Sequence, residues 1–156
     1  MVVRSPSGPT TKSSTRSTRR LPRGDNFTQY SIAVADGGTF GFSFWLHNTG
    51  SFPVTVTGVG DARNFAFGTN VVDVRMGRAS GTGTPASTLP FTIPPHAYAA
   101  VAVQARFNGC LDESTSTDFG TLPVSFDMFG FVQRETQIVM PMTIRLVGPT
   151  GAQCTP

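Results

Sequence analysis

Large apolar side chains occupy every second position from Phe40 to Leu46, and this alternation constrains the fold more than any other feature of the sequence. The positions between them carry small or polar residues, together with one tryptophan. Because successive side chains of a β-strand point to opposite faces of the sheet, a period of two predicts a strand with one aromatic face buried. The fold must therefore provide a second apolar layer for that face.

The same period recurs along most of the chain. It predicts strands at Phe27–Val34, Phe40–His47, Val54–Thr57, Phe91–Ile93, Tyr98–Phe107, Leu122–Met128 and Val132–Val147, with one or two further short strands around Phe65, Phe67, Val72 and Val74. Glycine and proline punctuate these runs, and only 13% of the residues are charged. About seven short strands without a convincing helix predict an all-β, immunoglobulin-like antiparallel β-sandwich.

Pro141 falls inside the last of these strands. Proline has no N–H group to donate to the strand ladder, so we expect a bulge or a sheet edge at this residue.

Positive charge is concentrated in the first 23 residues, which carry six basic side chains and no acidic one: Arg4, Lys12, Arg16, Arg19, Arg20 and Arg23. The remaining residues hold six arginines against nine acids, which gives 6 − 9 = −3. Residues 1–24 offer almost nothing apolar to bury, so we expect a disordered basic arm there, followed by one sandwich domain over residues 25–156. Within the arm, Arg16, Arg19, Arg20 and Arg23 are candidate contacts to nucleic acid or to another anionic surface.

The two cysteines, Cys110 and Cys154, are too few for a structural zinc site, and two buried thiols would be the simplest interpretation. The order of the predicted strands, however, places the two cysteines at the same end of the sandwich. Cys110 follows the strand that ends at Phe107; the chain then crosses the sandwich once over Leu122–Met128 and returns once to Val147, shortly before Cys154. An even number of crossings brings both cysteines to the same end, so we predict a disulfide, which persists only in an oxidising compartment.

The segment from Phe44 to Val56, with the sequence FWLHNTGSFPVTV, resembles the aliphatic-x-N-T-G-x-x-P-V/L-x-V signature of the abnormal-spindle and hydin type of immunoglobulin-like domain. Later features of the chain follow the order of that family: Phe65, Pro94-Pro95, the alternating Val101–Phe107, Gly120-x-Leu122 and Leu146-x-Gly148. At Asn108-Gly109-Cys110 the chain departs from the usual Phe-x-Pro step. The family is related in fold to major sperm protein and to pilus chaperones. The resemblance implies a cell-surface or secreted protein of bacterial type and implies no reaction.

Neither histidine lies in a catalytic motif. His47 falls on the face opposite the phenylalanines and His96 follows two prolines, so we interpret both as surface residues. Asp112, Glu113 and Asp118 share a polar loop, but their spacing lacks the alternating carboxylates and glycine of a calcium loop. We therefore expect no enzymatic activity, no cofactor and no metal site, and interpret the acidic loop as solvated.

Two other features permit a binding role. Trp45 lies on the polar phase of its strand; we expect it to be buried against a second layer or a loop, and if exposed it would be a binding anchor. Asn26-Phe27-Thr28 fits the N-glycosylation pattern and matters only in a host that glycosylates.

No stretch of the sequence is long and apolar enough for a membrane span, and residues 1–24 lack the apolar core of a signal peptide. Export would therefore require a segment upstream of Met1.

Two functions remain open at the level of the sequence. The first is a non-catalytic structural or binding module of an exported or cell-surface protein, with a protein or another cell-envelope component as partner. The second is a nucleic-acid-associated protein, such as a small viral coat protein that neutralises RNA with its basic arm.

Overall fold

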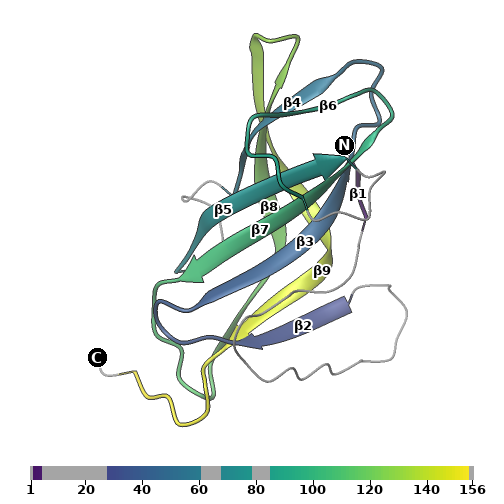
Figure 1. The fold of residues 1–156 in the computed structure, drawn as a ribbon. Coiled ribbons are helices and arrows are strands. Elements are labelled where there is room, and N and C mark those ends of the chain that lie inside the picture. Colours follow the sequence, from purple (N-terminus) through teal and green to yellow (C-terminus); the bar gives the residue numbers. More distant parts are fainter. Residues whose placement is uncertain (1, 5–27, 61–67, 79–84, 155–156) are drawn as a thin grey trace.

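The computed structural model describes residues 2–4, 28–60, 68–78 and 85–154. These residues form two β-sheets around a shared apolar core, with no helix among them (Figure 1). The first sheet has the order β1 (Val2–Arg4), β3 (Thr39–His47), β7 (Tyr98–Phe107), β5 (Thr69–Arg78). The second has the order β2 (Thr28–Ala33), β9 (Val132–Val147), β8 (Ser116–Met128), β4 (Val54–Val59), β6 (Phe91–Ile93). The predicted all-β sandwich is confirmed, with nine strands in the described residues where about seven were expected.

The core forms where the apolar faces of the two sheets meet. The aromatic face of β3 is buried as its alternation predicted, and Phe44 and Leu46 have no exposed surface. Across the core, the rings of Phe40 and Phe42 lie 6.2 and 5.9 Å from the ring of Phe119 on β8. These rings therefore pack the first sheet directly against the second.

The last strand is irregular around Pro141. Its register with β8 shifts between the pairs Phe119–Ile144 and Thr121–Val139, so that four residues of β9 stand opposite one residue of β8. The proline lies within this bulge, where its missing N–H group costs no ladder hydrogen bond. The predicted irregularity at this residue is confirmed.

One strand pair runs in the direction that the sequence did not predict. β2 pairs with β9 in parallel, from Thr28 opposite Met142 to Ala33 opposite Val147, so the expectation of purely antiparallel sheets is wrong here. Parallel neighbours need a long connection, and almost the whole domain separates these two strands in the sequence. β2 covers only the second half of β9, and the half that precedes Pro141 pairs within the described chain with β8 alone.

β8 begins earlier than its sequence pattern indicated. Ser116 to Phe119 precede the strand predicted over Leu122–Met128 and fall in the polar segment before it, yet they pair with the end of β9. Phe119 supplies the apolar contact that fixes this pairing, because it is buried in the core. Tertiary packing thus overrides the polar composition of the segment.

Residues Val2–Arg4 depart from the predicted disordered arm. They form β1, antiparallel to β3, with Val2 opposite His47 and Arg4 opposite Trp45. Without β1, β3 would be an edge strand with a row of unpaired N–H and C=O groups, and a Val-Val sequence favours strand pairing at such an edge. The rest of the arm lies outside the described residues.

Candidate functional site

Three phenylalanine side chains gather on the surface at one end of the sandwich. Phe52 comes from the β3–β4 loop, while Phe129 and Phe131 come from the turn between β8 and β9, which is the outermost part of the upper end in Figure 1. Their exposed fractions are 58%, 56% and 79%. The ring centroids of Phe52 and Phe129 lie 4.9 Å apart, and those of Phe129 and Phe131 lie 6.3 Å apart. The three rings form one exposed apolar patch, here called the aromatic tip, and such patches mark interaction sites.

The backbone of the turn does not favour a phenylalanine at position 129. Phe129 has φ 58° and Gly130 has φ 76°, and Phe131 N–H donates to Met128 O at 3.4 Å. Two successive positive φ values define a type I′ turn, for which Asn-Gly is the preferred pair. A bulky residue in the left-handed region costs on the order of 1–3 kcal/mol. The backbone of the turn therefore does not explain the aromatic ring at this position, whose contacts within the domain are with the rings of Phe52 and Phe131.

Asn48 holds the other loop of the tip in place. Its side chain is almost fully buried, at 3% exposure, and its Nδ2 lies 2.8 Å from Phe52 O, 3.1 Å from Ile93 O and 3.1 Å from Pro94 O. Its Oδ1 accepts from Gly50 N–H at 3.0 Å. One amide thus joins the β3–β4 loop to the end of β6, where the sequence had indicated only a turn.

The loops that meet at this end carry no charged side chain. Residues 48–53, 94–97 and 129–131 contain neither acid nor lysine nor arginine. The sequence did hold a signal for the tip, because Phe129-Gly130-Phe131 spans a predicted turn and so places both rings in solvent. The contact with Phe52 could not be read from the sequence, since it depends on how two distant loops meet.

The outer face of the first sheet carries a second aromatic group. The rings of His47 and Tyr98 stack with centroids 4.0 Å apart and an interplanar angle of 6°. Trp45 is half-buried on the same face, opposite Ala100 of β7, and so lies outside the core. His96 is exposed in the β6–β7 connection, which agrees with its interpretation as a surface residue.

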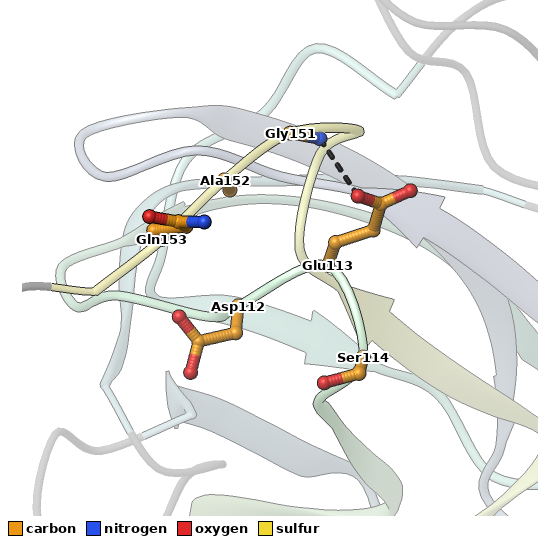
Figure 2. A pocket seen from close by; sticks show the side chains of 6 residues that line it. All are labelled: Asp112, Glu113, Ser114, Gly151, Ala152 and Gln153. Atoms are coloured by element: carbon orange, nitrogen blue, oxygen red, sulfur yellow. Dashed lines mark hydrogen bonds between the residues drawn. The ribbon is translucent and has the colours of Figure 1, made fainter.

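At the opposite end of the sandwich, an acidic loop holds the C-terminal tail (Figure 2). Glu113 Oε2 accepts from Gly151 N–H at 3.0 Å, and Asp112 Oδ1 accepts from Cys154 N–H at 2.5 Å. Together with neighbouring loop and tail residues, these carboxylates line an open hollow of about 430 Å³. Their hydrogen bonds are made to the backbone of the tail, so their role here is structural.

The predicted disulfide between Cys110 and Cys154 is confirmed, with Cα atoms 5.7 Å apart. It joins the segment after β7 to the tail, at the end where the topology placed both cysteines.

Asp118 lies on β8, so its predicted place in a polar loop with Asp112 and Glu113 is wrong. Arg145 on β9 donates to both of its carboxylate oxygens, at 2.7 and 2.8 Å. These hydrogen bonds lower the pKa of Asp118, partial burial opposes that shift, and the arginine charge adds to it. Within the described residues, no group of three or more His, Cys, Asp or Glu side chains is arranged to hold a metal ion.

Several predicted contacts lie outside the described residues. These are Arg16, Arg19, Arg20 and Arg23 of the basic arm, and Asn26 of the glycosylation pattern. The described part of the chain contains no helix that is long and apolar enough to cross a membrane.

No protein-family model matches this sequence, and no curated protein matches it. Among solved structures, the ASH/PapD-like domain 7 of human CEP192 is similar at a TM-score of 0.37 and 9% identity, over 90% of this chain and 96% of that one. A family 123 glycoside hydrolase from Clostridium perfringens, studied for its hydrolysis of glycolipid glycans, is similar at a TM-score of 0.40 and 7% identity. That match covers 78% of this chain, which spans only 23% of the hydrolase. At these scores neither protein indicates what this chain binds.

Proposed function

We propose that this chain is a non-catalytic, immunoglobulin-like binding module of an exported or cell-surface protein, and that the aromatic tip is its binding surface. The observation that carries the proposal is the contact among Phe52, Phe129 and Phe131, three rings that are each more than half exposed. Aromatic side chains without neighbouring charge are typical of the centre of an interface. Loops held by a rigid sheet scaffold are also the usual place for a binding site.

Export is supported by the disulfide between Cys110 and Cys154, because such bonds form and persist in oxidising compartments and are rare in the cytosol. The resemblance of residues 44–56 to the abnormal-spindle and hydin type of domain agrees with this, since its bacterial members occur mostly in surface and secreted proteins. Asn48 and Gly50 of that signature also hold the loop that carries Phe52, which stands at a variable position of the signature.

A role without catalysis is supported by how the ionisable groups are used. Asp112 and Glu113 accept backbone hydrogen bonds from the tail, and Asp118 pairs with Arg145. His47 stacks on Tyr98. These groups, within the part of the chain that the structure describes, are thus engaged in structural contacts.

The test of export is mass spectrometry of the non-reduced protein isolated from its native host, together with cell fractionation. The expected result is a Cys110–Cys154 disulfide in a fraction outside the cytoplasm. Alkylation of the protein in intact cells before lysis is the control, because it prevents oxidation during isolation. Two free thiols in the protein trapped in this way would overturn export.

The alternative, a nucleic-acid-associated protein, keeps its support from the six basic residues in the first 23. The sharpest test replaces Arg16, Arg19, Arg20 and Arg23 by Ser, which removes charge and leaves β1 in place. If single-stranded RNA binds the parent chain and the variant loses both affinity and salt dependence, the alternative is favoured.

A further inference from the structure

We propose that the aromatic tip, together with a polar hollow on the hairpin beside it, binds a neutral oligosaccharide. This proposal rests on the proposed function and deepens it, because it names the class of ligand that the tip binds. It joins the three exposed rings to a group of polar side chains that have no partner in the described part of the fold.

The hollow lies on the second sheet, near the turn that carries the tip, and has a volume of about 270 Å³. Three neighbouring strands line it: β4 with Thr57, β8 with Ser125 and Phe126, and β9 with Gln133, Arg134 and Glu135. Gln133 comes two residues after Phe131, so the hollow begins about 7 Å from the tip along the strand. One extended ligand can therefore contact both.

An irregularity of β4 shapes the hollow. The register between β4 and β8 shifts between Val56 and Gly58, so Thr57 is an extra residue on β4. Gly58 stands opposite Ser125 and has no side chain, whereas a β-carbon there would lie 3.4 Å from Ser125 Cβ. The glycine therefore leaves Ser125 uncovered on the β4 side. Bulges of this kind re-aim side chains and are frequent next to active sites.

The five polar side chains of the hollow make no hydrogen bond and no ion pair within the part of the chain that the structure describes. Other polar side chains of the domain are engaged: Asp118 pairs with Arg145, and Glu113 accepts from the backbone of the tail. Water satisfies a single exposed polar group. Five such groups around one hollow offer a ligand several hydrogen bonds at once.

The chemistry of these side chains selects a neutral ligand that is rich in hydroxyl groups. Arg134 and Glu135 give the lining one positive and one negative charge, so it has no net charge that would attract an ion. Gln133, Thr57 and Ser125 each donate and accept hydrogen bonds, as a sugar hydroxyl does. Two adjacent hydroxyls of a sugar ring also match the planar ends of glutamine, glutamate and arginine side chains.

The aromatic tip matches the other surface of a sugar. A pyranose ring has an apolar face of C–H groups, which packs on aromatic rings. Phe129 and Phe131 offer such rings, and the loops around them carry no charge. A lipid or a purely apolar peptide would leave the polar groups of the hollow without partners, at a cost in desolvation. A ligand with hydroxyls on its edge and C–H groups on its faces satisfies both surfaces.

The test is isothermal titration calorimetry of the oxidised, full-length chain with defined oligosaccharides. The probes are neutral hexasaccharides of glucose, mannose and N-acetylglucosamine, and an anionic hexasaccharide of galacturonic acid. We expect at least one neutral probe to bind more tightly than the anionic one, whose carboxylates would face Glu135. Its affinity should change less than about twofold when salt is raised to about 1 M, because the ligand carries no charge to be screened.

Gln133→Ala and Gln137→Ala are a matched pair that tests the hollow. Both glutamines are exposed on the same face of β9, but Gln137 stands opposite Pro123, outside the hollow. Gln133→Ala should weaken binding at least about fivefold, because it removes hydrogen bonds to the ligand, whereas Gln137→Ala should stay within about twofold of the parent. Circular dichroism melting verifies that both variants fold as the parent does.

A triple variant, Phe52→Ser, Phe129→Asn and Phe131→Ser, tests the tip. Asn suits the positive φ at position 129, so the turn is kept. Loss of the rings should weaken binding at least about tenfold. Val139→Ser is the control, because Val139 is 62% exposed and lies outside both the tip and the hollow; its binding should stay within about twofold of the parent.

The proposal is overturned if the parent chain binds no neutral hexasaccharide, if it binds the anionic probe most tightly, or if Gln133→Ala and Gln137→Ala lose affinity equally. A loss in the triple variant without a loss in Gln133→Ala would keep the tip as a binding surface and reject the hollow. Unchanged binding by the triple variant would instead contradict the tip itself, and with it that part of the proposed function. None of these measurements depends on the thiol state in the host, so failure of sugar binding and failure of export are separate outcomes.

Discussion

Replacing Asn48 by Ala should destabilise the sandwich far more than its place in a turn indicates. The side-chain amide shares its two N–H donors among three carbonyl oxygens, of Phe52, Ile93 and Pro94, at 2.8 to 3.1 Å. The bond to Ile93 O is buried, and the other two are partly buried. Alanine removes both donors, and with them all three hydrogen bonds, and offers nothing in their place.

The expected cost follows from those environments. A buried carbonyl left without a partner costs about 1–3 kcal/mol, and the two partly buried groups, which water can reach, add less. We therefore expect Asn48→Ala to lower the free energy of unfolding by about 2–4 kcal/mol. For a domain of this size that corresponds to a fall in Tm of about 5–15 °C.

Asn48→Asp separates hydrogen bonding from packing, because it keeps the shape of the side chain. The introduced carboxylate can still accept from Gly50 N–H, but it faces carbonyl oxygens where the amide had donated. The folded state therefore raises the pKa of that carboxyl above its unfolded value of about 3.9. Its penalty is full at neutral pH and shrinks as the pH falls through the raised pKa toward the unfolded value.

Urea denaturation at pH 7 and at pH 4 measures both effects. Asn48→Asp should be the less stable of the two variants at pH 7, and its deficit relative to the parent chain should narrow at pH 4. Thr49→Ala, an exposed change in the same turn, is the matched control and should stay within about 0.5 kcal/mol of the parent. If Asn48→Ala also stayed within that range, the amide would not be the anchor of these loops.

Three other predictions concern the core, the disulfide and an ion pair. Phe44→Ala should lower the free energy of unfolding, measured by urea denaturation, by about 3–5 kcal/mol, whereas the neighbouring Ser43→Ala should stay within about 0.5 kcal/mol of the parent. Similar losses in the two variants would mean that the assignment of inward-facing residues is wrong by one position. Replacing both Cys110 and Cys154 by Ser opens a loop with a sequence separation of 44 and should cost about 4 kcal/mol, measured against the parent chain with and without reductant. Arg145 lowers the pKa of Asp118, so the ion pair stabilises the folded state when this carboxyl is ionised. The difference in free energy of unfolding between the parent and Asp118→Asn should therefore be present above pH 3.8 and disappear as the pH falls through the lowered pKa. A difference of the same size at pH 2 would contradict this.

Strand positions were predictable because burial on one face imposes a period of two. Phe40 to Leu46 gives both the strand and the face that it buries, and a one-residue shift would expose every ring. The disulfide was predictable for a related reason, since Cys110 and Cys154 need only an even number of crossings to reach the same end. Both inferences use local patterns and chain direction, and neither needs the details of side-chain contacts.

The candidate site could not be predicted in the same way, because it depends on contacts between loops. Nothing in the sequence around Asn48 indicates that its amide reaches Ile93 and Pro94, which are 45 and 46 residues away. Nor does the sequence indicate that Phe52 meets the β8–β9 turn. The parallel pairing of β2 was also missed, since strand direction depends on which strands become neighbours.

Polar residues next to the aromatic tip distinguish it from an incompletely packed region of the core. The hairpin strand that leads away from the tip is polar on both faces, with five exposed residues in succession from Gln133 to Gln137, and its outer edge pairs with no strand in the described part of the chain. An unpaired edge with apolar side chains would recruit other strands, and charged and polar residues there prevent it. The chain therefore protects the hairpin along Gln133–Gln137, and its exposed large apolar side chains lie on either side of this stretch, at the tip and at Val139. The polar stretch next to the rings agrees with the proposed binding surface, because a packing defect would show no such boundary between polar residues and the apolar tip.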